Sequence, residues 1–285
     1  MTITHAAEHA AEEAHTMVDG VPVAIRPLVS NEDCRACVQL QREIWGFEVG
    51  DVVPASLVHV VSMVGGLAAG AFDASGTMLG FVFGVTGIRD GVLAHWSHML
   101  GVRETVRNGG VGRMLKEYQR DALARIGVVR VYWTFDPLQA KNAYFNLHRL
   151  GAHVDEYVPD MYGDTGSPLH LGLPTDRLIV HVRTAGRDVD ATRLASDVNV
   201  PILTPVPCEA DVVVDRQNAT PGTVLIEMPA DVMDVTSRSI DDARAWRMAV
   251  REHFRWAFEN GYRATGAHRN PATGRSFYIM TRAGG

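Results

Sequence analysis

The clearest pattern of hydrophobic and polar positions lies between residues 92 and 126. A mainly apolar run, residues 92–102, is followed by a segment in which apolar residues recur every three or four positions, residues 113–126. This change of period predicts a strand followed by an amphipathic helix. Between them stands Arg107-Asn108-Gly109-Gly110-Val111-Gly112, with three glycines in four residues. The sequence therefore predicts a strand, a glycine-rich turn and a helix.

Several strands are expected before this turn. Residues 21–27 form a short strand, and a helix begins at Ser30 to Asp33, where a cap and acidic residues stand together, and ends at Gly46. The turn at residues 73–76 is typical of a hairpin and joins two further strands. A run of antiparallel strands is thus expected ahead of the glycine-rich turn. The two hairpin strands are residues 60–72 and 78–86.

The chain after the amphipathic helix alternates between strands and helices. Gly127 ends that helix, and Asp136-Pro137 predicts the start of another, which Gly151 ends. Four prolines and scattered charge mark residues 184–222 as linker and irregular structure. The other expected elements are strands at 128–135, 178–183 and 223–228, a strand or loop at 154–162, a helix at 239–260, and a hairpin of 262–269 with 276–281.

These elements predict an α/β protein of the α+β type. A mixed, mostly antiparallel sheet flanked by helices would form the larger domain, residues 21–183. A smaller strand–helix–hairpin unit, residues 184–285, would pack against it and shape part of the site. Residues 1–20 are expected to be a polar tail.

Composition limits the classes of function. The 285-residue chain has a net charge of −6 and a pI near 6.0, which argues against a general nucleic-acid binder. The N-terminus lacks the basic and apolar regions of a signal peptide, and the longest apolar run, residues 56–72, is shorter than a membrane span and reads as buried strand. We expect a soluble cytoplasmic protein that binds neither nucleic acid nor membrane.

Cysteine and histidine patterns point to structure rather than to metal or redox chemistry. Cys34 and Cys37 have redox-motif spacing, but they lie in a helical pattern, and Cys208 is far away. Small core-facing residues are the favoured interpretation of the pair. His5 and His9 would share one face of a helix, yet a frayed polar tail is favoured there. No metal site is predicted.

The glycine-rich turn predicts an anion site. Glycines leave backbone amides unshielded, and the following helix adds its unpaired first-turn donors and the positive end of its dipole. These features suit a phosphate or pyrophosphate. Arg113 stands where a P-loop would carry lysine, and the preceding antiparallel strands do not fit a dinucleotide-binding βαβ unit.

The spacing of Arg107, Gly110 and Gly112, between a strand ending Leu100-Gly101-Val102 and a long helix, resembles motif A of the GNAT family of acyl-CoA-dependent N-acyltransferases. The resemblance covers about residues 21–183. It implies acetyl-CoA or another acyl-CoA as co-substrate, with the pyrophosphate on the loop and the pantetheine arm along the strand end, where this strand splays from the next. The implied cofactor residues are Leu100, Gly101, Val102, Arg107, Asn108, Gly109, Gly110, Val111, Gly112 and Arg113, with Asn142 and Asn146 as candidates for the pantetheine or adenosine part.

The catalytic positions of that family are altered in this sequence. The family usually places a base, often Glu, on the strand before the loop, and this strand instead carries His95, Ser97 and His98. Alternation puts His95 and Ser97 on one face and His98 on the other, and either histidine is a candidate base. Leu147 stands at the usual position of the Tyr acid, so Tyr144, one turn earlier, is a substitute candidate.

The C-terminal helix carries an arginine stripe. Arg244, Arg247, Arg251 and Arg255 recur at spacings of three, four and four residues, which suits either a solvated face paired with acids or an anion site.

The resemblance to the GNAT family implies transfer of an acetyl group to an amine of a small molecule or amino acid by direct attack. The alternative is a non-catalytic acyl-CoA-binding module, and exposed strands in the C-terminal unit would be compatible with a homodimer.

Overall fold

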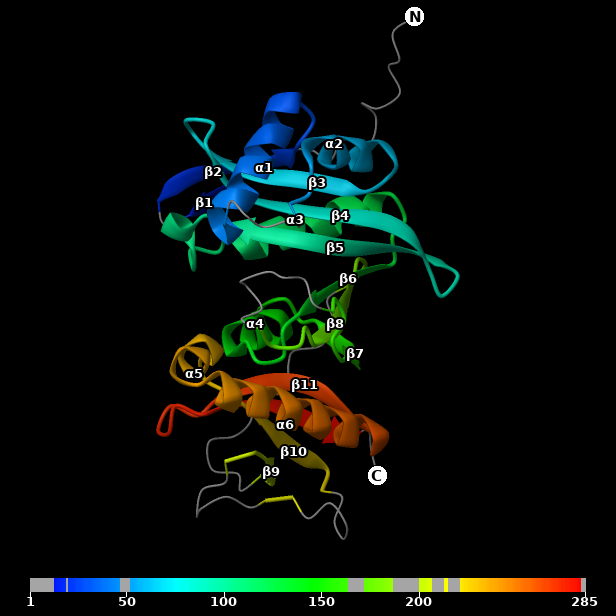
Figure 1. The fold of residues 1–285 in the computed structure, drawn as a ribbon. Helices are drawn as coiled ribbons and strands as arrows, with labels where there is room; N and C mark the ends of the chain where they lie inside the picture. The colour runs from blue at the N-terminus through cyan, green and yellow to red at the C-terminus, as the bar shows by residue number, and fades with distance from the viewer. Residues whose placement is uncertain are drawn as a thin grey trace, which may run out of the picture. The chain divides into compact units, whose positions relative to one another are not determined.

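The computed structural model describes residues 13–18, 20–46, 52–163, 172–186, 200–206, 213–214 and 221–282. The chain forms two compact units (Figure 1). The first comprises Met1–Trp133 and Arg183–Gly186, and the second comprises Thr134–Val182 and Arg187–Gly285. The units divide the chain after Trp133, Val182 and Gly186. The predicted domain boundary at residue 183 stays a prediction.

The first unit is built on a mostly antiparallel sheet, as the sequence predicts. Neighbouring strands pair in chain order and antiparallel from β1 to β5, and β5 pairs with β6 in parallel. The strands are β1 (Ala14–Val18), β2 (Val21–Pro27), β3 (Leu67–Asp73), β4 (Met78–Arg89), β5 (Val92–Val102) and β6 (Arg130–Phe135), of which β6 continues into the second unit.

The predicted N-terminal tail contains a strand. β1 pairs along its whole length with β2, from Ala14 opposite Ile25 to Val18 opposite Val21. The prediction of a tail over residues 1–20 is therefore wrong for β1. Val18 is buried, so pairing and burial together order a segment whose composition alone reads as polar. His5 and His9 lie outside the described residues.

The predicted strand over residues 60–72 is wrong in its first part. A helix, α2 (Ala55–Met63), occupies the start of the apolar run, and only β3 is a strand. Val58 and Val61 are buried at helical spacing while Val60 is exposed. Gly65, at φ 82°, makes the turn between the two elements. Apolar residues on both faces of α2 concealed its helical period.

Helices cover both faces of this sheet (Figure 1). Helix α1 (Asn31–Trp45) begins with the predicted cap, in which Ser30 and Asp33 form a capping box, and ends at Gly46. Side chains of α1 and α2 form one buried cluster with those of β3 and β4, and Cys34 and Cys37 are buried in it as free thiols, as predicted. Cys208 lies outside the described residues.

Helix α3 (Val111–Arg125) packs on the opposite face of the sheet. A Cβ at Gly80 of β4 would lie 3.1 and 3.2 Å from side-chain atoms of Leu115 and Val111 of α3, whereas one at Gly101 of β5 would lie 2.8 Å from Ile44 of α1, in the other helical layer. Gly127, at φ 80°, follows α3 as predicted. Strands β4 and β5 thus lie between two helical layers.

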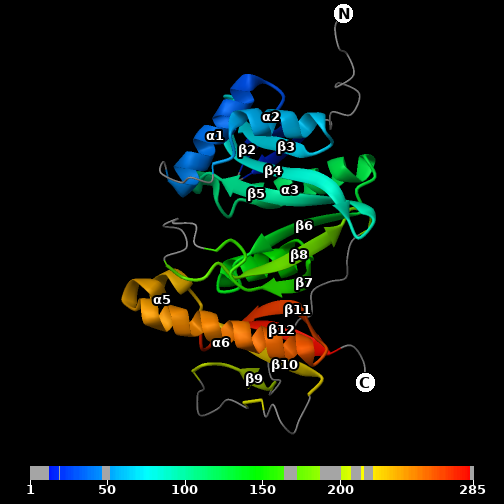
Figure 2. The ribbon, with the colours of Figure 1, turned by 45° about the vertical axis from the view of Figure 1, so that its right-hand side comes forward.

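The second unit contains a smaller, four-stranded sheet with the order β11-β12-β10-β9, beside which helix α6 lies (Figure 2). Strands β7 and β8 pair antiparallel in the same unit. Its elements are α4 (Ala140–Tyr144), the π-helical turn η2 (Phe145–Arg149), β7 (His153–Val158), β8 (Arg177–Arg183), β9 (Ile202–Leu203), β10 (Thr223–Met228), α5 (Val232–Arg238), α6 (Ile240–Glu259), β11 (Tyr262–Arg269) and β12 (Ser276–Arg282).

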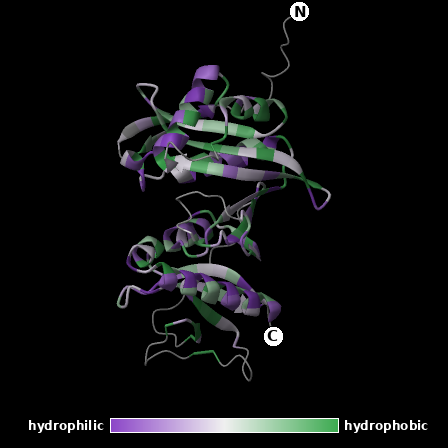
Figure 3. Cartoon of the chain, viewed as in Figure 1, coloured by the Kyte–Doolittle hydropathy of each residue, from purple (hydrophilic) through white to green (hydrophobic). Residues whose placement is uncertain are grey.

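Two predicted helices differ in extent. The helix expected from Asp136 begins at Ala140, because Asp136 caps only a turn by accepting from the amide of Leu138 at 2.8 Å. The C-terminal helix begins at its predicted cap, Ser239, but α5 precedes it. Hydrophilic and hydrophobic residues alternate along α6 (Figure 3), and its buried Phe254 packs on Tyr278, with ring centroids 4.9 Å apart.

Among the described residues, no helix is long and apolar enough to cross a membrane.

Candidate functional site

The predicted glycine-rich turn connects β5 to α3 through a short 3-10 turn, η1 (Glu104–Val106). The amides of Val106 and Arg107 donate to the carbonyls of Arg103 and Glu104 at 3.1 and 3.2 Å. These bonds fix the chain directly after β5 and direct the following residues toward the start of α3.

Two residues of the turn have left-handed backbone angles, Asn108 with φ 69° and Gly110 with φ 93°. Gly110 is the N-cap of α3, and no side chain caps this helix end. A Cβ at Gly110 would meet no atom within 4 Å, so the backbone angle, rather than crowding, favours glycine there.

The first turn of α3 presents three backbone amides that lack an acceptor in the part of the chain that the structure describes. The helix ladder begins with the amide of Met114, which donates to the carbonyl of Gly110 at 3.1 Å. The amides of Val111, Gly112 and Arg113 come before it. Unpaired donors at the positive end of a 15-residue helix form a site for an anion.

Two exposed guanidinium groups flank these amides in the sequence. Arg107 donates from Nε to the carbonyl of Val102 at 3.3 Å, which holds its stem against the end of β5. Arg113 forms an ion pair with Glu117 at 2.9 Å, one turn along α3. Both side chains are exposed, so they add positive charge around the open amides.

Strand β5 contains a bulge at His98. Opposite it, Phe83 of β4 pairs with Met99 and Gly84 pairs with Ser97, which leaves His98 as the extra residue. A bulge of this kind interrupts the ladder and changes the direction of the strand's side chains.

The bulge determines which side chains of β5 meet α3. His95 and Ser97 contact polar side chains of α3, which confirms that they share a face. Beyond the bulge, Met99 packs against the cluster of α1 and α2, on the other face. With unbroken alternation Ser97 and Met99 would have shared a face, so the extra residue at His98 explains why Met99 lies on the face opposite to Ser97.

The pairing between β5 and β6 is short. It covers three residues of each strand, after which Ser97 is the first residue of β5 beyond the register. Within the described part of the first unit, the later residues of β5 have no pairing with β6, which leaves this edge open for an extended ligand. The paired residues are Ala94 with Arg130, His95 with Val131 and Trp96 with Tyr132.

The candidate base His95 is fully buried, and both its ring nitrogens have partners. Nε2 lies 3.1 Å from the amide nitrogen of Gln119, and Nδ1 lies 2.9 Å from the hydroxyl of Thr86. Since the amide nitrogen only donates, Nε2 accepts and Nδ1 carries the proton. Burial, together with the charge of Lys116, lowers the pKa of His95 to about 3. His95 is therefore neutral and weakly basic.

The other candidate base, His98, is exposed at the bulge. Its ring meets the edge of Phe83 with centroids 6.3 Å apart. Its predicted role as a base stays a prediction, and its position on the face opposite to His95 and Ser97 is as alternation predicts.

Lys116 of α3 is a polar residue of this region that the sequence reasoning missed. Its Nζ donates to the hydroxyl of Ser97 at 2.7 Å and lies 4.1 Å from the centre of the Trp133 ring. The residue is buried, although the helical pattern assigns it to the polar side of α3. The available signal was indirect, since inward-facing His95 and Ser97 on a buried strand require polar partners from the covering helix.

The remaining predicted site residues belong to the second unit. Tyr144 is 48% exposed, and its ring stacks on His148 with centroids 4.8 Å apart. Leu147, at the position where the family carries Tyr, is buried. Asn142 is exposed and Asn146 is buried. The proposed roles of Tyr144, Asn142 and Asn146 stay predictions.

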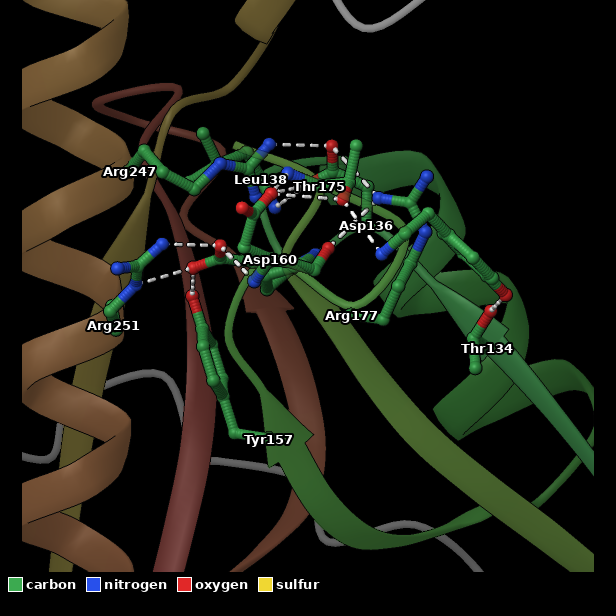
Figure 4. Close-up of polar contacts among 12 residues, drawn as sticks. Thr134, Asp136, Leu138, Tyr157, Asp160, Thr175, Arg177, Arg247 and Arg251 are labelled. Atoms are coloured by element: carbon green, nitrogen blue, oxygen red, sulfur yellow. Dashed lines mark hydrogen bonds and ion pairs between the residues drawn. The ribbon is translucent and has the colours of Figure 1, made fainter. Parts of the chain in front are cut away.

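The arginine stripe is divided between exposed and buried ion pairs. Arg244 and Arg255 are exposed and pair with acids of α6 itself, Asp241 and Glu252. Arg247 is 2% exposed and binds Asp136, while Arg251 binds the fully buried Asp176 at 2.9 and 2.6 Å (Figure 4). In the second unit, acids of the same chain therefore occupy the two inner arginines.

No group of three His, Cys, Asp or Glu residues in the described ranges is arranged to hold a metal ion.

No protein-family model and no curated protein matches the sequence. Solved structures that match the fold include acetyltransferases of the GNAT family. One is a putative GNAT acetyltransferase from Desulfovibrio desulfuricans, at 17% identity and a TM-score of 0.45, covering 57% of this chain and 99% of its own. Another is the ribosomal-protein-S18-alanine N-acetyltransferase from Escherichia coli, at 16% identity and a TM-score of 0.45, with 61% and 99% covered. A third, an aminoglycoside 6′-N-acetyltransferase complexed with coenzyme A, has 17% identity and a TM-score of 0.43, with 58% and 99% covered.

Proposed function

We propose that this protein is an acyl-CoA-dependent N-acyltransferase that transfers an acetyl group from acetyl-CoA to an amine of a small molecule or amino acid. The observation that carries the proposal is the set of open amides of Val111, Gly112 and Arg113 at the start of α3. They follow, after η1 and the glycine-rich turn, a strand whose described pairing with β6 ends at Trp96.

The pyrophosphate, the pantetheine arm and the thioester of acetyl-CoA each have a counterpart in this arrangement. The pyrophosphate would accept from the open amides, with Arg107 and Arg113 supplying compensating charge. The amide-rich pantetheine arm would lie along residues 100–102 of β5 and form hydrogen bonds with the strand edge. The thioester would then lie deeper along β5, toward the end of its pairing with β6.

The chemistry needs an uncharged amine and a path for its proton. The amine nitrogen attacks the thioester carbonyl, the carbon–sulfur bond breaks, and the nitrogen loses a proton while the CoA thiolate gains one. The protein's main contribution is to hold the thioester and the amine in contact. Direct transfer requires no covalent intermediate on the protein.

Binding is tested with Gly112→Asp and isothermal titration with acetyl-CoA. A carboxylate in the first turn of α3 suits the helix dipole, so folding is preserved, but it repels the pyrophosphate. We expect the affinity to fall by about tenfold or more. Ala124→Asp is the matched control, since it adds the same charge at the exposed far end of α3, and its affinity should change by less than about threefold.

Turnover is tested separately, by release of CoA thiol with a panel of amines and amino acids. Acceptor-stimulated release by the wild-type protein supports the transferase. Tight binding without release for any acceptor would favour the non-catalytic acyl-CoA-binding module. Equal affinity of Gly112→Asp and wild type, or no binding by the wild type, would contradict the proposed site.

A further inference from the structure

Lys116 is one of only two lysines in the chain, the other being Lys141. It is buried between α3 and the sheet, while arginine supplies nearly all the other cationic side chains. Its Nζ contacts the hydroxyl of Ser97, the amide oxygen of Gln119 at 3.5 Å and the face of Trp133. Among the described residues, no carboxylate contacts it.

This environment favours an uncharged amine. An ammonium group buried without an anionic partner is strongly destabilised, and lysine responds by releasing its proton. Burial lowers the pKa of Lys116 to about 7. An amine of this strength gains and loses a proton near neutral pH, as a proton acceptor in catalysis must.

The groups that face Lys116 do not compete for this role. Strand β5 contributes Ser97 and His95, α3 itself contributes Gln119, and β6 contributes Trp133. His95 is the only titratable side chain in this set, and its own pKa is lowered to about 3. Through His95, β4 adds only the Thr86 hydroxyl. Lys116 is therefore the one member of the set that changes charge near pH 7.

The position of the pair coincides with the end of the β5–β6 pairing. Ser97 is the first residue of β5 beyond the register, and Trp133 follows the last paired residue of β6. Ser97 faces α3, where Lys116 lies, on the same face as His95. Because β5 and β6 stop pairing at this point, the Ser97–Lys116 pair lies at the start of the part of β5 that does not pair with β6.

We propose that the Ser97–Lys116 pair accepts the proton released when the amine attacks the thioester. The inference rests on the proposed acyl transfer. As the N–C bond forms, the amine proton passes to Ser97 Oγ while the Ser97 hydroxyl proton passes to Lys116 Nζ. The C–S bond breaks, and the thiolate takes the proton back from the Lys116 ammonium through the same hydroxyl, so the pair is unchanged after each turnover.

The first test is independent of turnover. In protein labelled with 13C at the lysine ε carbon, NMR shows two lysine signals, and Lys116→Met assigns them. We expect the Lys116 signal to titrate near pH 7. Titration of the Lys116 signal only above about pH 9 would overturn the proposal and leave acyl transfer itself intact.

The second test compares pH profiles of kcat/KM for CoA release. The wild type should gain activity as pH rises through about 7. Lys116→Met should lose about 100-fold of kcat/KM and this pH dependence, while its affinity for acetyl-CoA stays within about threefold. Lys116→Arg keeps a permanent positive charge and should not restore activity. Ser97→Ala should lower kcat/KM by at least about tenfold.

Lys141→Met is the matched control and should retain the wild-type rate and profile. An unchanged pH profile in Lys116→Met, or full activity in Lys116→Arg, would overturn the role of the pair while acyl transfer stands. If the wild-type protein binds acetyl-CoA but transfers no acyl group, the proposed function fails and the proton path fails with it. Should Lys116→Met not fold, Ser97→Ala and the NMR titration of the wild type still decide the question.

Discussion

The carboxylate of Asp136 accepts a hydrogen bond on each oxygen from Arg247, and both bonds are 2.7 Å long. The two residues are 111 positions apart, one directly after β6 and the other in α6 (Figure 4). Tyr278 of β12 adds a hydrogen bond to the carbonyl of Pro137 at 2.8 Å. Within the second unit, the C-terminal helix and hairpin are thus tied to the segment that follows β6.

Breaking this pair should destabilise the protein strongly. In Arg247→Met, the Asp136 carboxylate loses both charge-assisted hydrogen bonds, and we expect the free energy of unfolding to fall by about 3 kcal/mol. Adding Asp136→Asn should recover part of the loss, because it removes a carboxylate whose remaining ion pair, with Arg177, is 3.9 Å long. Urea denaturation measures both effects. A loss below about 0.5 kcal/mol would show that the pair contributes little.

Arg255→Met provides the control on the same helix. Arg255 is exposed and pairs with Glu252 three positions earlier, at 3.1 Å. Exposed pairs of this kind contribute little, so the free energy of unfolding should change by less than about 0.5 kcal/mol.

The glycines at the two ends of α3 offer a second, matched comparison. Gly110 and Gly127 have φ angles of 93° and 80°, and a Cβ would meet no atom within 4 Å at either position. Gly110→Ala and Gly127→Ala should each destabilise the fold by about 1 kcal/mol through backbone strain. Only Gly110→Ala should weaken acetyl-CoA binding, by about tenfold or more. Calorimetry that finds equal affinities for the two variants would contradict an anion site at residues 110–113.

The stability of the protein should depend on Lys116 in a defined pH range. The native pKa is lowered to about 7, whereas an unfolded lysine titrates near about 10.4. Between these values the unfolded chain binds more protons, so stability rises with pH, by up to about 1.4 kcal/mol per pH unit from this group. Below pH 7 both states are protonated, and the destabilisation by the buried charge is complete.

Urea titrations of the wild type and Lys116→Met at pH 7, 8 and 9 measure this contribution, because all other titrating groups are shared. The difference in unfolding free energy should move in favour of the wild type as the pH rises. Parallel curves for the two proteins would show that Lys116 is charged in the native state.

A fourth prediction concerns His98. If Ser97 and Lys116 carry the proton, His98→Gln should retain kcat/KM within about threefold, since His98 lies at the bulge on the other face of β5. A loss of about 100-fold in the CoA-release assay would instead support His98 as the base, as the sequence suggested.

The sequence predicts elements well where one face is apolar and a cap or glycine marks the end. Helix α1, with Ser30 and Gly46, and strand β5 match their predicted ranges for this reason. Helix α2 was missed because apolar residues stand on its exposed face as well, including Val60 and Met63, which hides the helical period.

The candidate site was predictable only in part. The glycine pattern alone indicates the open amides at the start of α3, because backbone donors need no particular side chain. Lys116 could not be found in this way. Its burial depends on how α3 packs against β5, where it meets Ser97, and this tertiary contact leaves no mark in the local hydrophobic pattern. The ion pairs of Arg247 with Asp136 and of Arg251 with Asp176 likewise depend on tertiary contacts that the sequence pattern does not show.

The bulge also makes β5 a strand with two phases. Before His98, the odd-numbered residue Ser97 faces α3, whereas after it the odd-numbered residue Met99 faces α1 and α2. A complete substitution scan of β5 should therefore show tolerance that alternates with period two and then shifts by one residue at His98. Deleting His98 would remove the extra residue and make Ser97 and Met99 consecutive, so the two would keep their opposite faces by ordinary alternation. A single deletion there should therefore damage the fold less than a single deletion elsewhere in the strand, which would shift the register.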